Sequence, residues 1–138
     1  MTFETAFPGQ GSLQQLLIAT DCDISNGTWR HADNSTTENY RLKVQIGGDL
    51  DLAAAASIDA KGRGYDGSQG PGEPISGTYV GGSHGGQGGT YQGGEQWGPT
   101  YGSATAPTNI GSGGSSFSGG GAVFLAVGGA TTIDGTID

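Results

Sequence analysis

The feature that most constrains this chain is a glycine-rich run from Gly62 to Gly121, which holds 22 of the chain's 30 glycines. Glycine at that density normally leaves a chain unfolded, because each glycine raises the entropy cost of ordering and adds no side chain to a core. In three tracts, however, glycine recurs at every third position apart from Tyr91 and Phe117: 64–70, 82–94 and 111–120. A polyproline-II type helix has this period, and glycine along one edge lets neighbouring backbones hydrogen-bond. We therefore expect ordered, extended, polyglycine-II-like segments that pack on each other or on a sheet.

Few side chains are present from which to build a hydrophobic core. The 138 residues are enough for one domain, but hydrophobic residues make up only 33% of them, which is below the usual share. Backbone hydrogen bonds and close packing of glycine must therefore contribute more to stability than in an ordinary domain.

Strand signals lie on both sides of the glycine-rich run. Apolar and polar residues alternate over residues 40–52, which indicates a strand with one buried face, and Gly47-Gly48 interrupts the alternation as a turn. Residues 122–127 are apolar at successive positions, which predicts a strand covered on both faces. The leucines of residues 12–20 fit a short helix or a strand, and we favour a strand after Gln15.

One unit recurs in these strand regions. It consists of an apolar strand, a glycine turn and a short strand, and recurrence of such a unit is typical of a solenoid whose rungs stack in parallel. The copies are residues 24–29, 44–59 and 125–138, and the second is longer than the third by two residues in the Ala53–Ala56 run.

These signals predict an all-β fold, a short parallel β-helix with solenoid-like rungs and a polyglycine-II-like insert. A β-sandwich with glycine-rich loops is the alternative. We expect a single domain over residues 1–138, which divides into a leading arm (1–11), the first rungs (12–61), the glycine-rich insert (62–121) and a closing rung (122–138).

Charge limits the partners of the chain. Five basic residues against thirteen acidic ones give a net charge of −8, which argues against binding to nucleic acid or to an anionic membrane. Because no stretch approaches the roughly 20 apolar residues of a membrane span, we expect no membrane insertion. No signal peptide is recognisable, and we interpret the chain as a module of a longer secreted protein. The single Cys22 cannot form an internal disulfide, and we expect it to be a small buried residue.

The order of several motifs resembles the glycine-rich modules of very large secreted or surface-anchored bacterial proteins. These motifs are Gly-Gly-Ser-His-Gly-Gly-Gln-Gly-Gly (81–89), Ala106–Gly114, Gly119–Val123 and Ile133-Asp-Gly-Thr-Ile137. The resemblance implies an extracellular or cell-surface location and a β-helix-like fold, and it transfers no catalytic motif. The period-three tracts are also similar to the polyglycine-II bundles of certain phage tail adhesins and of a glycine-rich antifreeze protein, although Tyr91 and Phe117 interrupt two tracts.

Acidic residues suggest calcium binding or catalysis. Gly62-Arg-Gly64-Tyr-Asp66 resembles the calcium-binding β-roll repeat, so Asp66, Gly62 and Gly64 are a candidate calcium site, with a simple turn as the alternative. Stacked rungs could also gather carboxylates into a calcium site or an acid/base pair, and the alternative is a solvated acidic face. These carboxylates belong to Asp21, Asp23, Asp49, Asp51, Asp59, Asp134 and Asp138. His31 and His84 each lie alone in the sequence, and we assign no catalytic residue and no cofactor other than calcium.

Four aromatic residues are candidates for ligand binding, because flat rings in glycine-rich surroundings can stack on sugar faces. The alternative is that the rings pack over glycine backbone and shield it from water. The four are Tyr79, Tyr91, Trp97 and Tyr101.

The sequence therefore predicts a non-enzymatic extracellular structural or adhesion module. If the ends of the rungs are uncapped, copies can stack head to tail into filaments. The alternative is a carbohydrate-binding module that recognises cell-surface or matrix glycans through exposed aromatics. A third hypothesis, a polysaccharide-degrading enzyme on a β-helix, rests on fold analogy alone.

Overall fold

The computed structural model describes residues 1–5, 16–91 and 93–138, so most of the expected leading arm lies outside the described residues. The chain separates into two compact units. The solenoid unit comprises Met1–Ala32, Tyr40–Ala60 and Val123–Asp138, and the glycine-rich unit comprises Asp33–Asn39 and Lys61–Ala122.

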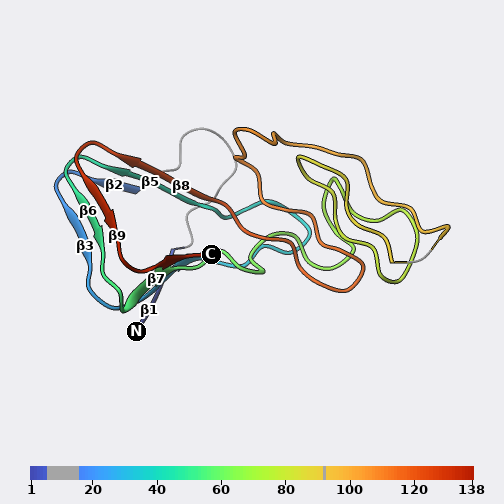
Figure 1. Ribbon diagram of the computed structural model, residues 1–138, viewed down its shortest axis with the longest axis horizontal. Coiled ribbons are helices and arrows are strands. Elements are labelled where there is room, and N and C mark those ends of the chain that lie inside the picture. Colours follow the sequence, from blue (N-terminus) through green and yellow to red (C-terminus); the bar gives the residue numbers. More distant parts are fainter. Residues whose placement is uncertain (6–15, 92) are drawn as a thin grey trace. The chain divides into compact units, whose positions relative to one another are not determined.

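All named strands belong to the solenoid unit, and the described residues contain no helix (Figure 1). The strands form three sheets in the orders β1-β4-β7-β10, β2-β5-β8 and β3-β6-β9. Their bounds are β1 Thr2–Thr5, β2 Leu16–Ile18, β3 Cys22–Ile24, β4 Gly27–His31, β5 Leu42–Ile46, β6 Leu50–Leu52, β7 Ala56–Ile58, β8 Val123–Val127, β9 Thr131–Ile133 and β10 Thr136–Ile137.

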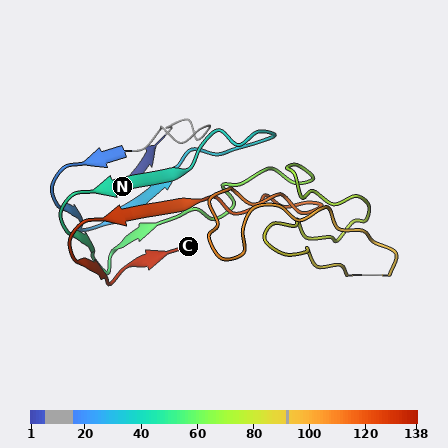
Figure 2. The same ribbon diagram turned by 90° about the horizontal axis from the view of Figure 1, so that it is seen from above.

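The sheets are three walls around which the chain winds. Strands β2 to β4 form the first rung, β5 to β7 the second and β8 to β10 the third, and the rungs lie one above another in Figure 2. All pairings between rungs are parallel, because the chain returns to the same wall in the same direction after each turn. The predicted solenoid is therefore confirmed, whereas the alternative β-sandwich, which is built from antiparallel sheets, is wrong.

The sequence repeat coincides with the register of the rungs. Val44 pairs with Leu125, and Leu52 pairs with both Ile133 and Ile24. Each copy of the repeat is thus part of one rung. The strand predicted after Gln15 is also confirmed, since β2 begins at Leu16, and residues 2–5, which the sequence assigned to the leading arm, form β1.

The core of the solenoid unit lies in the second rung, which has a rung on either side. Its inward residues are at most 2% exposed: Leu42, Val44, Ile46, Leu50, Leu52 and Ile58. The corresponding residues of β2, β3 and β8, among them Cys22, are only partly buried. The prediction that β8 is covered on both faces is wrong, because Phe124 is 49% exposed on its outer face. The outward residues of the central strand β5, Lys43 and Gln45, are not buried either, so the outer face of this sheet is open to solvent among the described residues.

Stacked corners explain why the repeat contains paired glycines. The Gly47 amide donates to the Ile18 carbonyl (2.8 Å), and the Gly128 amide donates to the Ile46 carbonyl (2.8 Å). A side chain at Gly129 would overlap the Asp49 carboxylate, which accepts the Ala130 amide at 2.7 Å. The aspartate of one corner therefore caps an amide of the next rung, and the neighbouring glycine leaves room for it.

The glycine-rich unit is held together by its main chain. The first and third tracts lie side by side, because the Tyr65 amide donates to the Gly111 carbonyl (3.0 Å) and the Gly119 amide donates to the Tyr65 carbonyl (2.8 Å). A methyl group at Gly64 would overlap the carbonyl oxygens of Gly111 and Gly120. The tracts therefore pack on each other as predicted, while a polyglycine-II conformation of each tract stays a prediction.

Candidate functional site

Two of the predicted ligand-binding aromatics come together on the glycine-rich unit. Tyr79 is 66% exposed and Tyr91 is 75% exposed, and their ring centroids lie 5.7 Å apart in an edge-to-face arrangement. Glu95 links their main chains, because its carboxylate accepts the Tyr91 amide at 2.7 Å and the Tyr79 amide at 3.4 Å. The two rings therefore form one exposed aromatic pair.

Tyr101 has a different environment from this pair. Its hydroxyl donates to the Ile110 carbonyl (2.5 Å) and accepts from the Ser112 hydroxyl (3.1 Å), and its ring lies edge-on to His84 at 4.7 Å between centroids. Burial raises the pKa of Tyr101 above its ordinary value. This ring packs within the unit, as in the alternative interpretation of the aromatics, whereas Trp97 is exposed to a smaller extent than Tyr79 and Tyr91.

A hollow of about 540 Å³ lies beside Tyr79. Phe117, which is 80% exposed, lines it together with residues 78–82, Ser112 and residues 114–118. The sequence analysis treated Phe117 only as an interruption of a glycine tract and not as a binding residue. That interruption could have identified it, since a ring that replaces glycine in a close-packed tract has to point away from the packed backbone.

The backbone beneath the hollow is fixed by Ser115. Its amide donates to the Val80 carbonyl (2.8 Å), its hydroxyl donates to the Gly77 carbonyl (3.0 Å), and its hydroxyl oxygen accepts the Val80 amide (3.1 Å). The Gly114 amide donates to the Phe117 carbonyl (2.9 Å), which closes the turn that carries the Phe117 ring. These bonds fix the backbone next to Tyr79 and at Phe117.

The predicted calcium residues lie in a turn of the glycine-rich unit. The Asp66 carboxylate accepts the Ser35 hydroxyl (2.7 Å) and the Ser118 hydroxyl (3.5 Å), Gly62 has a φ of 65°, and Gly64 lies against the third tract. In residues 1–5, 16–91 and 93–138, no group of three or more His, Cys, Asp or Glu side chains could hold a metal ion. The calcium site therefore stays a prediction that rests on the sequence motif.

Two of the aspartates near the repeats, Asp21 and Asp49, contribute to the stacking of rungs. Asp21 accepts the Asp49 amide (2.9 Å), so it caps a corner as Asp49 does in the next rung. Asp23 and Asp51 are register partners on neighbouring strands and are exposed. Of the two histidines, His31 is fully buried in the solenoid unit, and its Nδ1 lies 2.8 Å from the Ala32 carbonyl oxygen, while His84 belongs to the glycine-rich unit.

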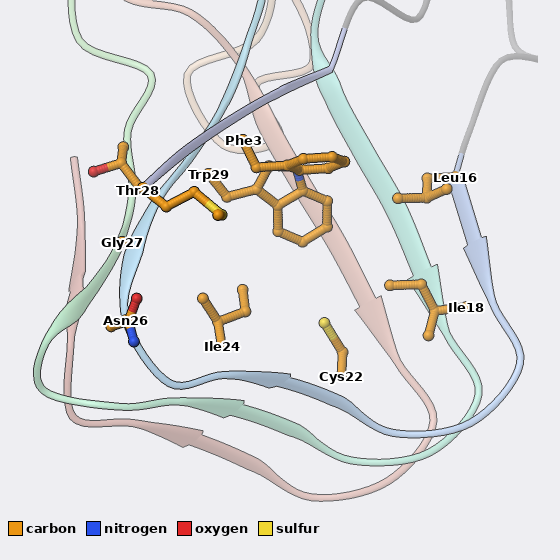
Figure 3. A pocket seen from close by; sticks show the side chains of 10 residues that line it. Phe3, Leu16, Ile18, Cys22, Ile24, Asn26, Gly27, Thr28 and Trp29 are labelled. Atoms are coloured by element: carbon orange, nitrogen blue, oxygen red, sulfur yellow. The ribbon is translucent and has the colours of Figure 1, made fainter.

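A second hollow, of about 340 Å³, lies at the open end of the first rung. The side chains of Leu16, Ile18, Cys22 and Ile24 point into it, and Phe3 and Trp29 line it across from them (Figure 3). Burial raises the pKa of the Cys22 thiol, and the charge of Asp23 raises it further. This end of the solenoid unit is therefore an apolar surface.

Searches against protein-family models, curated protein sequences and solved structures find no match to this chain. In the part of the chain that the structure describes, no helix has the length and apolar character needed to cross a membrane. The roles of the two hollows therefore have to follow from their own geometry and chemistry.

Proposed function

We propose that this chain is a non-enzymatic structural or adhesion module of an extracellular surface, and that its solenoid unit associates with a second copy through the ends of its rungs. The observation that carries the proposal is the difference in burial between rungs. The inward side chains of the second rung are fully buried, whereas the first and third rungs keep apolar side chains partly exposed. A further rung on either end would bury that surface.

The two ends are chemically complementary. The first rung offers the apolar hollow, and the third rung offers Leu125, Val127 and Ile133. A head-to-tail contact would pair β8 of one copy with β2 of the next, and β9 with β3. These strands already pair in parallel with β5 and β6, and among the described residues no strand pairs with their other edges, so a second copy could continue both sheets.

Strand β1 competes with such a contact. The sheet that contains β1 has four strands, whereas the other two have three. Phe3 of β1 pairs with Trp29 at the level where β10 of a stacked copy would pair, and Glu4 forms an ion pair with Arg30 (2.9 Å). All three walls can therefore continue into a second copy only when β1 leaves β4. Association is expected to be weak while β1 is bound.

Sedimentation velocity at rising protein concentration tests this proposal. We expect the intact chain to associate weakly and a variant that lacks residues 1–5 to associate more strongly, with a mass that rises with concentration. Within the deletion variant, Thr131→Lys places a charge in the inward column of Leu50 and should abolish association. Thr132→Lys, in the outward column of Asp51, is the matched control and should associate normally. A deletion variant that stays monomeric at every concentration contradicts the proposal.

Carbohydrate binding is a second candidate function, which the exposure of the Tyr79–Tyr91 pair favours. Exposed aromatic rings offer flat apolar faces that are suited to the faces of sugar rings. Affinity electrophoresis of the intact chain in gels that contain soluble polysaccharides tests this function. Migration that no polysaccharide retards would remove it.

A further inference from the structure

The hollow beside Tyr79 combines two properties that sugar recognition needs. The first is exposed ring surface: Tyr79 and Phe117 line the hollow, and Tyr91 supports Tyr79 from the side. The second is a set of hydroxyl and main-chain groups, which Thr78, Ser116, Ser118 and the glycines of residues 81–82 bring to the same hollow. A sugar ring presents an apolar face and a rim of hydroxyls, so both kinds of group have a partner on it.

The backbone that carries the rings is held in place without a ligand. Ser115 fixes the Val80 backbone on one side of the hollow, and the turn from Gly114 to Phe117 fixes the other side. On the tyrosine side, Glu95 accepts the amides of Tyr79 and Tyr91. A site that is positioned in advance loses little further conformational entropy when it binds.

The charges around the hollow select among glycans. None of the described residues that line it is charged. Two carboxylates accept hydrogen bonds from residues that line it: Asp66 from the Ser118 hydroxyl and Glu95 from the Tyr79 amide. The chain as a whole carries a net charge of −8. An acidic polysaccharide would be repelled, whereas a neutral one would not.

We propose that this hollow binds a neutral glycan, with a hexopyranose ring stacked on Tyr79 or Phe117 and its hydroxyls bonded to the serine and main-chain groups. The inference rests on the carbohydrate-binding candidate function and narrows it to one site and one ligand class. Of the four candidate aromatic residues, Tyr79 lines the hollow and Tyr91 contacts the Tyr79 ring, whereas Trp97 and Tyr101 do not line the hollow.

The test is affinity electrophoresis of the full chain in gels that contain either neutral or acidic polysaccharides. The neutral probes are a mixed-linkage β-glucan, a galactomannan and a xyloglucan, and the acidic probes are alginate and polygalacturonate. We expect at least one neutral probe to retard the chain and the acidic probes to leave its migration unchanged. At least one of Tyr79→Ala and Phe117→Ala, the variant that removes the stacking ring, should weaken retardation by about tenfold.

Ile75→Ala is the matched control, because Ile75 is an exposed apolar residue of the same unit that does not line the hollow, and this variant should bind as the intact chain does. Amide NMR signals give a readout that does not depend on a variant. An oligosaccharide of the retarding glycan should shift the signals of Gly81, Gly82 and Ser116.

Three results would overturn the inference while carbohydrate binding itself survives. The first is retardation by acidic probes only. The second is unchanged retardation of both the Tyr79→Ala and the Phe117→Ala variant. The third is a glycan-induced shift of signals that excludes the three named amides. If no probe of either kind retards the chain, the candidate function fails together with the site.

Discussion

The two units of this protein are held together in different ways. The solenoid unit buries aliphatic side chains of its second rung between two neighbouring rungs. Among the described residues of the glycine-rich unit, the buried hydrophobic side chains are only Tyr65, Val80 and Ile110, and most of the bonds between its tracts run from main chain to main chain. The solenoid unit is stabilised by packed side chains, whereas the glycine-rich unit needs positions without side chains so that its main chains can approach each other.

Glycine makes room for different groups in the two units. At the corners of the solenoid unit, Gly48 and Gly129 make room for the aspartates that cap the next rung. In the glycine-rich unit, glycines such as Gly64 and Gly113 lie directly against carbonyl oxygens of another tract. In both places glycine is needed because another group occupies the position of its missing Cβ atom.

Hydrogen exchange tests most directly whether the glycine-rich unit is ordered like the solenoid unit. The amides of Tyr65, Gly111 and Gly119 donate to main-chain carbonyls of another stretch of the chain. We expect them to exchange at least about a hundredfold more slowly than in an unfolded chain, as amides in cooperatively ordered structure do. The amides of β5 serve as an internal reference. Exchange of the glycine-rich amides at the unfolded rate would mean that only the solenoid unit is folded.

Among single substitutions, Leu52→Ala should cause the largest loss of stability. Leu52 is fully buried in the second rung, and truncation of such a leucine lowers the free energy of unfolding by about 2–5 kcal/mol. Leu16→Ala, in the partly buried first rung, is the comparison variant and should cost less. Urea denaturation followed by circular dichroism measures both. Equal losses would contradict the special burial of the middle rung.

Gly119 and Gly120 provide a matched pair for the glycine-rich unit. A methyl group at Gly119 would overlap the Gly111 carbonyl oxygen, whereas a methyl group at Gly120 would have no neighbour within 4 Å. Gly119→Ala should therefore destabilise the unit by about 1–3 kcal/mol, as overpacking does. Gly120→Ala should change stability by no more than about 0.5 kcal/mol. Hydrogen exchange at the Tyr65 amide reports on both variants. Similar effects of the two substitutions would show that the close contact at Gly119 does not determine the loss of stability.

The capping role of Asp49 should have a smaller effect. Asp49→Ala removes the acceptor of the Ala130 amide and should cost about 1 kcal/mol of unfolding free energy. Asp49→Asn keeps an acceptor and should cost less. Asp51→Ala, at an exposed position of β6, should have little effect. Denaturant titration of the three variants checks this order, and a loss for Asp51→Ala that matches that of Asp49→Ala would refute it.

Tyr101 gives the smallest expected effect at neutral pH. Tyr101→Phe removes the hydroxyl that bonds to Ile110 and Ser112 and should cost about 0.5–1.5 kcal/mol. Because burial raises its pKa above the ordinary value of 10.0, the stability that Tyr101 contributes is fully present below about pH 10 and declines as the pH rises toward the folded-state pKa. The variant should therefore lose less stability between about pH 9 and 11 than the intact chain. Unfolding measured across that range tests this, and parallel pH profiles would contradict it.

Much of the solenoid unit could be predicted from its sequence. The alternation over residues 40–52 identified the buried face of β5, and the internal repeat identified Val44 and Leu125 as equivalent positions before their pairing was observed. Both signals are patterns along the sequence, so they can be recognised without knowledge of the fold. The exposure of Phe124 could not be predicted in this way, because it depends on whether another layer of the structure covers the outer face of its sheet.

The candidate site was predictable only in part. Composition identified Tyr79 and Tyr91 as candidates, and the structure adds that their rings touch and that Phe117 shares the hollow. The same criterion included Tyr101, whose hydroxyl is bonded within the unit. Whether a ring among glycines is buried or exposed depends on which distant tract lies beside it, and no local pattern encodes that.

The sequence was sufficient to predict the rungs and the close packing of backbone, because both follow from periodic patterns. The periods are two residues along a strand, three along a glycine tract, and one repeat for each turn of the solenoid. The tertiary structure was needed to show which aromatic rings face solvent, and that β1 adds a fourth strand to one wall while the other two have three each among the described residues. The physical reason is that periodicity is a property of neighbours in the chain. Exposure and competition for a strand edge are properties of neighbours in space.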